Sequence, residues 1–262
     1  MPIISNAVPA SFDRLARTYD AEFTHSAIAQ WLRARVWQRL DALFSPGMRV
    51  LEIGCGTGED ALHLAQRGVE VVATDASLVM LAVAAQKILA AGLTATFHHF
   101  DLNDPQNWKL DSIFDGVYSN FGPLNCTHHW KPLADFLEQK TTAQAYLAFG
   151  VMGRFCLWET LWHGFHLDWR TATRRWSGKS TAQVHDGNPF TVYYPSSRQL
   201  AQAFAPVFSP VRKTGLGVFL PPSDIFPVIE TRPTLMNLLM NLESRLAPPV
   251  LADHYWLELQ KI

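Results

Sequence analysis

Three glycines within five residues, Gly54, Gly56 and Gly58, separate an apolar segment from a segment with helical spacing. Glycine lets a backbone approach a ligand closely and adopt positive φ angles where a turn requires them. The free N–H groups at the start of the following helix can bind a carboxylate or another polar ligand group. A tight turn that binds nothing is the alternative interpretation. The spacing therefore indicates a ligand-binding loop.

Two acidic residues follow the next two predicted strands. Asp75 comes 17 residues after Gly58, and Asp101 follows the third strand. Open α/β sheets bind ligands at the carboxyl ends of their strands, and a carboxylate after the second strand binds ribose hydroxyls there. Aspartate is also common in turns and at helix N-caps. Because acids follow two consecutive strands beyond the glycine-rich loop, we interpret both as ligand-binding residues.

The glycine spacing differs from that of dinucleotide-binding proteins. Their G-x-G-x-x-G motif requires a last glycine at the position where this sequence has Glu59. The sequence therefore disfavours an oxidoreductase that uses a nicotinamide cofactor.

The elements that must position these residues alternate between strand and helix. Two helices are predicted between residues 11 and 44 from their apolar spacing. Such alternation produces right-handed crossovers and a parallel, doubly wound sheet. The predicted strands are 49–53, 69–74, 94–100, 113–119, 144–151, 211–219 and 255–259, with a short extended piece at 191–194. The predicted later helices are 59–67, 77–91, 132–139, 155–176, 196–204 and 235–246.

Residues 50–58, VLEIGCGTG, resemble motif I of the class I S-adenosylmethionine-dependent methyltransferases. Asp75 and the pair Asp101-Leu102 match the positions after that family's second and third strands. Residues 12–20, FDRLARTYD, resemble the N-terminal helix of its small-molecule branch, whose tyrosine lies near the cofactor. The resemblance implies an α/β, Rossmann-like, doubly wound sheet of seven strands with the last strand antiparallel.

The resemblance also implies S-adenosylmethionine as the cofactor and S-adenosylhomocysteine as its product. The glycine-rich loop would hold the methionine moiety and Asp75 the ribose. Asp101 would bind the adenine amino group and Leu102 the adenine ring, while Asn120 would face the methionine moiety or the site of methyl transfer. The complete predicted cofactor set is Tyr19, Glu52, Gly54, Cys55, Gly56, Gly58, Asp75, Ala76, Asp101, Leu102 and Asn120.

Several roles stay open at this level. Arg33 and Arg35 are candidates, by charge alone, for binding the carboxylate of the cofactor. An oxygen or nitrogen acceptor can require a general base. His128, His129 and Glu159 are the candidates for that base, and no catalytic residue is assigned.

We expect one methyltransferase domain over residues 1–262. N-terminal helices occupy 9–46, the cofactor-binding core 47–152, a helical lid insertion 153–190, and the rest of the sheet with a helix at 233–246 occupies 191–262. The insertion carries an apolar stripe that includes Trp158, Trp162 and Phe165. This stripe is either a helix packed on the core or an aromatic wall over a bulky, apolar substrate.

The distribution of charge restricts the kinds of substrate and binding partner that the chain can have. Segment 154–215 carries eight Lys or Arg against three acids, which favours an anionic substrate, a membrane surface or simply a solvated basic face. The whole chain has 22 Lys and Arg against 23 Asp and Glu, a net charge of −1, which gives no electrostatic footprint for nucleic acid. Enzymes that methylate the exocyclic amines of bases carry Asn/Asp-Pro-Pro-aromatic after the fourth strand, whereas this chain has Asn-Phe-Gly-Pro at 120–123.

Three scattered cysteines predict neither a disulfide framework nor a zinc site, and paired histidines at 128–129 lack partners at metal-ligand spacing. No signal peptide or membrane span is predicted, so a cytoplasmic location is expected.

From the resemblance and the composition together, we predict methyl transfer to a small-molecule acceptor, bulky or hydrophobic, by in-line displacement (EC 2.1.1 class). The alternatives are a module that binds the cofactor without turnover and an RNA or DNA methyltransferase. The acceptor and the oligomeric state are not predicted.

Overall fold

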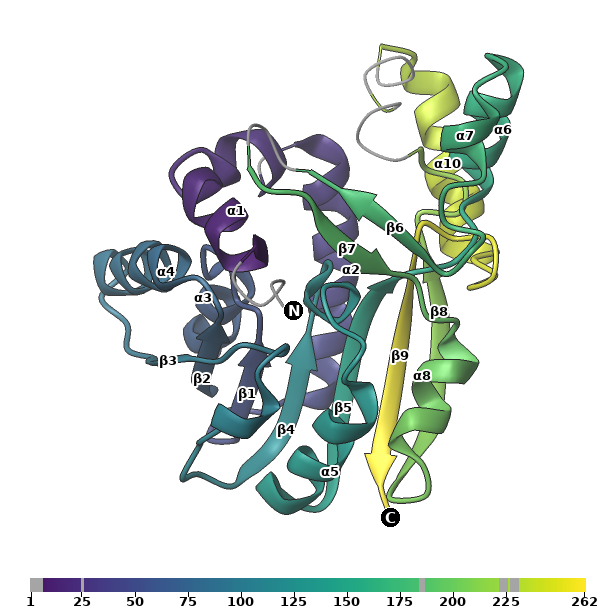
Figure 1. Cartoon of the computed structure of the whole chain (residues 1–262). Helices are drawn as coiled ribbons and strands as arrows, with labels where there is room; N and C mark the ends of the chain where they lie inside the picture. The colour runs from purple at the N-terminus through teal and green to yellow at the C-terminus, as the bar shows by residue number, and fades with distance from the viewer. Residues whose placement is uncertain (1–6, 25, 184–186, 222–225, 227–230) are drawn as a thin grey trace.

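The computed structural model describes residues 7–24, 26–183, 187–221, 226 and 231–262. Its main sheet has seven strands in the order β3-β2-β1-β4-β5-β9-β8 (Figure 1). The strands are β1 (Arg49–Ile53), β2 (Glu70–Asp75), β3 (Thr96–His99), β4 (Phe114–Ser119), β5 (Thr141–Met152), β8 (Phe208–Leu216) and β9 (His254–Lys261). The helices are α1 (Ala7–Leu15), α2 (Ala27–Leu43), α3 (Glu59–Gln66), α4 (Leu78–Ala90), α5 (Trp130–Lys140), α6 (Leu157–Phe165), α7 (Trp169–Ala172), α8 (Ser197–Phe204) and α10 (Pro233–Arg245). A short π-helix covers Asp20–Thr24.

The direction of the strands is that of a doubly wound fold. Strands β1 to β5 run parallel to one another, and β9 runs antiparallel to both β5 and β8. The predicted seven-stranded sheet with an antiparallel last strand is therefore confirmed. The order reverses between β1 and β4, which creates the switch point where such sheets bind ligands.

Alternate residues of the strands form two hydrophobic cores on opposite faces of the sheet. Along β1, Val50 belongs to the core under α2, α3 and α4, while Leu51 and Ile53 belong to the core under α5 and α8. Both cores contain side chains with no exposed surface, such as Leu40 in the first and Phe204 in the second. The sheet is thus fixed from both sides, and its carboxyl edge is held rigidly.

Two local features differ from the prediction. Strand β8 begins at Phe208, three residues earlier than predicted, and carries Pro210 next to an irregularity in its pairing. Proline is tolerated there because β8 is an edge strand. The segment predicted as one helix at 155–176 forms the separate helices α6 and α7, because Leu167 between them adopts a φ of +62°.

A small second sheet was missed by the sequence analysis. Strand β6 (Lys179–Ala182) pairs antiparallel with β7 (Phe190–Tyr193), of which only the second was predicted as extended. Figure 1 shows this hairpin above the carboxyl ends of the central strands, near α1. Residues 184–186 between the two strands, which lie within the predicted insertion, and residue 25 of the predicted N-terminal helices lie outside the described residues. Within the described part of the chain, no helix combines the length and apolarity needed to cross a membrane.

Candidate functional site

A cavity of about 520 Å³ lies at the carboxyl ends of the central strands. Small-molecule sites usually have volumes of roughly 300–1,000 Å³, so this cavity has the size of a ligand site. The predicted cofactor residues that line it are Tyr19, Glu52, Gly54, Cys55, Gly56, Asp75, Ala76, Asp101, Leu102 and Asn120. The sheet therefore brings together ten residues that the sequence spreads over about a hundred positions.

Gly58 is the predicted site residue that does not line the cavity. It precedes α3 with a φ of +79°, and a Cβ atom there would lie 2.7 Å from the Cβ of Ala84. Its lack of a side chain lets α3 pack closely against α4. This is the packing role that a third glycine has in related nucleotide-binding loops.

Gly54 has a different constraint, because its missing side chain makes room for Pro123. Its φ is +75°, and a Cβ atom would lie 2.2 Å from Cγ of Pro123. The loop after β1 and the loop after β4 thus meet at this glycine, and together they form one side of the cavity.

Gly54→Ala is expected to lower the free energy of unfolding by roughly 2–4 kcal/mol, because strained backbone and overpacking add. Gly47→Ala is the matched control, since Gly47 has a φ of +85° but no atom within 4 Å of the added Cβ. That control should lose only the strain, about 1–2 kcal/mol. Urea denaturation of both variants measures the difference, and equal losses would show that contact with Pro123 does not matter.

Asp75 links the glycine-rich loop to the start of α4. Its carboxylate accepts hydrogen bonds from the backbone N–H of Gly56 at 2.9 Å and of Ser77 at 2.8 Å. Burial raises the pKa of Asp75, although these N–H groups act against the rise. The carboxylate is therefore held at the edge of the cavity and fixes the loop that surrounds it.

Asp101 sits at the end of the neighbouring strand and is positioned in a similar way. Its carboxylate accepts a hydrogen bond from the backbone N–H of Asn103 at 2.8 Å. Leu102 is 7% exposed and packs with Phe100 and Trp108 in the core on that face of the sheet. An acid beside an apolar side chain gives this end of the cavity both a hydrogen-bond acceptor and a flat apolar wall.

A buried polar group that the sequence analysis missed lies beside the glycine-rich loop, and Asp60 of α3 is its centre. Its carboxylate accepts hydrogen bonds from Arg33 Nη1 at 2.6 Å, from Trp37 Nε1 at 2.7 Å and from Asn120 Nδ2 at 2.9 Å. Arg33 and Asn120 both line the cavity. The signal in the sequence was an acid on the apolar face of α3, where Asp60 is buried beside Ala61 and Leu64.

Glu52 lies at the floor of this part of the cavity, within β1. It is 3% exposed, and burial together with the nearby Asp60 raises the pKa of its carboxyl well above the ordinary value. Of the two arginines considered from the sequence, Arg33 lines the cavity, whereas Arg35 lies 4.9 Å from the ring of Trp31. Of these two candidates, Arg33 is therefore the one that a carboxylate in the cavity can reach.

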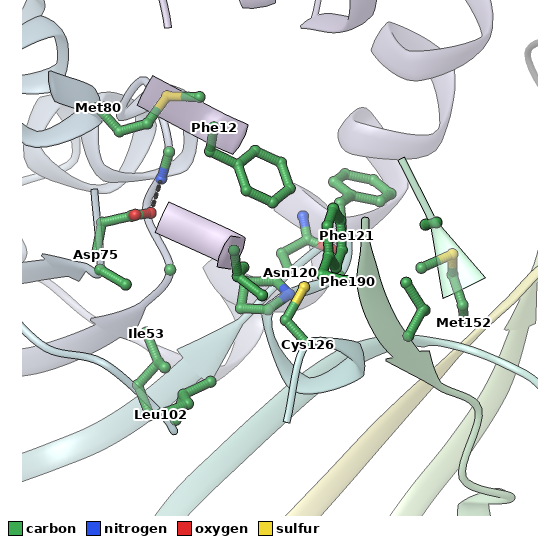
Figure 2. A pocket seen from close by; sticks show the side chains of 18 of the residues that line it. Phe12, Ile53, Asp75, Met80, Leu102, Asn120, Phe121, Cys126, Met152 and Phe190 are labelled. Carbon is green, nitrogen blue, oxygen red and sulfur yellow. Dashed lines mark hydrogen bonds between the residues drawn. The ribbon is translucent and has the colours of Figure 1, made fainter. Parts of the chain in front are cut away.

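The other half of the cavity is mainly apolar, although Arg174, Arg175 and Ser180 also line the cavity. Figure 2 shows Phe12, Phe121 and Phe190 grouped with Cys126 and Met152, on the side away from Asp75 and Leu102. The rings of Phe12 and Phe190 lie 6.0 Å apart. Burial raises the pKa of the Cys126 thiol to about 12, so this cysteine is a neutral wall residue and no nucleophile at neutral pH.

This apolar half is covered by α1 and the β6–β7 hairpin. Ser77 Oγ donates a hydrogen bond of 2.5 Å to Asp13 of α1, and Ser11 Oγ donates one of 3.1 Å to the carbonyl of Asn188. The N-terminal segment is also tied to the glycine-rich loop, because Thr57 Oγ1 donates to Asp20 at 2.5 Å. The cover over the cavity is thus attached to the same loop that forms its floor.

The open candidates for a general base lie outside the described lining of the cavity. Glu159 is 3% exposed and forms ion pairs with Arg174 and Arg175, so its carboxylate is already committed. Those two arginines, and not Glu159, line the cavity. Among the described residues, no group of three His, Cys, Asp or Glu side chains is arranged to hold a metal ion.

This fold and site define a class of protein. A doubly wound sheet with an antiparallel β9, a glycine-rich loop after β1 and acids after β2 and β3 are the features of class I methyltransferases. Residues 50–140 match the family model described as "Methyltransferase domain". Residues 50–140 therefore match a methyltransferase domain, and they lie within a fold typical of the class I, S-adenosylmethionine-dependent methyltransferases.

Individual relatives agree with this assignment. Demethylmenaquinone methyltransferase of Renibacterium salmoninarum is 34% identical over 139 residues, which cover 50% of this chain and 53% of the relative. The chain thus spans about half the length of the curated relatives it matches.

Solved structures extend the likeness to the whole chain. Magnesium protoporphyrin IX methyltransferase from Synechocystis PCC 6803, determined with bound S-adenosylhomocysteine, has a TM-score of 0.59, 18% identity and 98% coverage of both chains. The cyclase SpnF has a TM-score of 0.65, 14% identity and coverage of 98% of this chain and 96% of its own. At such low identity, these likenesses establish the fold and not the reaction.

Proposed function

We propose that the protein transfers the methyl group of S-adenosylmethionine to a small, apolar acceptor. The observation that carries this proposal is that one cavity has two unlike halves. One half has the glycine-rich loop, two acids and the largely buried Arg33, and the other half is lined mainly by aromatic and sulfur-containing side chains, although Arg174, Arg175 and polar side chains of the hairpin such as Ser180 also line the cavity. A module that only bound the cofactor would not need the second half. An RNA or DNA substrate would require a basic, open surface, whereas α1 and the hairpin cover this chamber.

The residues of the first half fit the parts of S-adenosylmethionine. Arg33 is the partner we assign to the carboxylate of the methionine moiety, because its Nε–H is buried and has no hydrogen-bond partner among the described residues. Asn120 has a buried Oδ1 that likewise has no hydrogen-bond partner among the described residues. Asp75 would bind the ribose hydroxyls, and Asp101 with Leu102 the adenine. An orphaned buried donor and acceptor indicate a site shaped for a polar ligand.

The bound cofactor supplies an activated methyl group on a sulfonium sulfur. The protein's contribution is to hold the acceptor in line with the sulfur–carbon bond and to exclude water. Such positioning supplies roughly 7–11 kcal/mol of barrier lowering when the geometry is right. Phe121 lines the cavity, and the guanidinium of Arg33 lies over one face of its ring at 5.2 Å. We assign the opposite face of the ring to the sulfonium, which such a contact stabilises by about 0.5–2 kcal/mol.

Thermal unfolding with and without ligand tests the proposal. S-adenosylmethionine and S-adenosylhomocysteine, each at 100 times its dissociation constant, should stabilise the protein by about 2.7 kcal/mol. For a chain of this size the Tm should rise by about 5–10 °C. NAD should give no shift, and Asp75→Ala should abolish the response because it removes the ribose acceptor. The proposal is wrong if neither sulfur compound raises the Tm of the parent protein.

A screen of apolar acceptors, with S-adenosylhomocysteine formation as the readout, then tests turnover. We place the activity in the cytoplasm, where the free thiols of Cys55, Cys126 and Cys156 stay reduced. Formation of product with acceptors of polar, charged character only would contradict the apolar class.

A further inference from the structure

The insertion carries an exposed apolar surface that the cavity does not use. We call Leu161, Phe165, Leu167 and Trp169 the aromatic tip. Their exposed fractions are 50%, 85%, 78% and 62%. The apolar stripe predicted for this segment is therefore only partly packed, with Trp158 against the core and the tip facing solvent. Large apolar side chains clustered on a surface mark interaction sites.

The backbone holds the tip in this exposed arrangement. Leu167 joins α6 to α7 in the left-handed region at a φ of +62°, which is unfavourable for a leucine. Trp169 folds back beside α6, where its ring lies 3.6 Å from the position of a Cβ added to Gly164. Leu167 follows the C-cap of α6, where its N–H donates to the carbonyl of Gly164 and the N–H of Asp168 donates to that of His163. Phe165, Leu167 and Trp169 thus project from one helix end.

Positive charge surrounds the tip. In the described parts of residues 157–182 and 231–250, the exposed charged side chains without a buried acid as partner are Arg170, Lys179, Arg232 and Arg245 against the single acid Asp168, while the exposed Arg174 is paired with Glu159. The other two acids of these segments, Glu159 and Glu243, are buried at 3% and 1% exposure. Helices α6, α7 and α10 occupy the same end of the molecule (Figure 1). The described residues at this end therefore combine exposed aromatic side chains with an excess of positive charge.

We propose that the aromatic tip docks on the surface of a membrane that contains anionic lipids. Trp and Phe insert at the boundary of headgroups and acyl chains, while Lys and Arg bind anionic headgroups. A second copy of the chain fits the surface less well, because a two-fold contact brings identical patches together and opposes like charges.

The segment that carries the tip also contributes residues to the cavity. Arg174 and Arg175 follow α7 directly, and both line the cavity. An apolar acceptor dissolved in the bilayer would then reach the apolar half of the cavity from the membrane side. This consequence rests on the proposed function, whereas the docking itself does not.

Cosedimentation with vesicles tests the docking. The full chain is mixed with vesicles of pure phosphatidylcholine or with vesicles in which a third is phosphatidylglycerol. We expect binding to the anionic vesicles that weakens as salt is raised, and about tenfold or weaker binding to the neutral ones. The variant F165S/W169S should lose about tenfold in partition coefficient per aromatic side chain. Arg170→Glu should weaken binding to the anionic vesicles only.

Leu89→Ser is the matched control, because Leu89 is 74% exposed on α4, away from the insertion. It should bind vesicles like the parent chain. Equal binding of F165S/W169S and the parent would overturn the proposal, as would equal binding to neutral and anionic vesicles. A dimer in light scattering that F165S/W169S converts to monomer would assign the tip to a second copy instead.

The same variants separate this proposal from the proposed function. Because the tip residues do not line the cavity, F165S/W169S should keep the full thermal response to S-adenosylmethionine. Loss of vesicle binding with that response intact supports docking. If the parent chain binds vesicles but its Tm does not rise with S-adenosylmethionine, the proposed function is wrong and the docking proposal still holds.

Discussion

Asp60→Ala is expected to lower the free energy of unfolding by about 3–5 kcal/mol and to abolish the thermal response to S-adenosylmethionine. Removal of one member of a buried ion pair leaves the other charge uncompensated, which accounts for a loss of this size. Asp60 is 4% exposed, and the Arg33 side chain is 13% exposed. Trp37 and Asn120 also lose their acceptor. Differential scanning fluorimetry should show a Tm lower by about 10 °C.

A double variant distinguishes the charge from the packing. Asp60→Ala combined with Arg33→Met removes both charges, so it should recover part of the stability that Asp60→Ala alone loses. It should not recover the response to S-adenosylmethionine, because Arg33 is the residue we assign to the cofactor carboxylate. Asp60→Asn keeps the shape and should lie between the parent and Asp60→Ala in stability. A double variant as unstable as the single one would show that the charge on Arg33 is not the cause.

Glu159→Ala is expected to have the second large effect, again about 3–5 kcal/mol. Its carboxylate accepts two hydrogen bonds from Arg174, at 3.0 and 2.6 Å, and two from Arg175, at 3.1 and 2.8 Å. Without it, two guanidinium groups face each other, and the Arg175 side chain is only 6% exposed. Urea denaturation should show the loss in stability, and binding of S-adenosylmethionine should persist because Glu159 does not line the cavity.

Arg174→Ala is the control for this prediction. The Arg174 side chain is 45% exposed, so water solvates it and its removal should cost only up to about 1 kcal/mol. In this variant Arg175 still has its ion pair with Asp253, at 2.8 Å. Burial acts to raise the pKa of Asp253, but Arg175 and His254 hold that pKa below its ordinary value. Equal losses for Glu159→Ala and Arg174→Ala would contradict the account of a buried carboxylate between two cations.

The fold was predictable because its signals are local and repeated. The helix predicted at 77–91 forms as α4, and it begins where the side chain of Ser77 accepts a hydrogen bond from the N–H of Met80. Strand β8 was predicted to begin too late in the sequence, because a proline such as Pro210 normally excludes a strand. Proline is tolerated in a strand at the edge of a sheet, and the position of β8 at the edge could not be read from the sequence. The break between α6 and α7 at Leu167 was missed because leucine rarely adopts a positive φ, so its presence does not predict one.

Only those residues of the site that belong to a sequence motif could be predicted. The glycine-rich loop and the acids Asp75 and Asp101 line one cavity, as the positions after neighbouring strands imply. The partnership of Arg33 with Asp60 was not predictable, because it joins α2 to α3 across 27 positions of sequence. The apolar half was equally hidden, since Phe12 and Phe190 come from opposite ends of the domain.

The position of β9 has a consequence for how the molecule folds. This strand comes last of the seven in sequence, yet it lies between β5 and β8 and is the only main-sheet neighbour of β8 among the described strands. Its partners are distant, since Tyr146 pairs with Gln260. The fold therefore has a high contact order, and loop-closure entropy makes such pairings slow to form. During synthesis, β5 and β8 must wait with exposed edges until β9 emerges, so chaperone binding and aggregation should concentrate on these two strands.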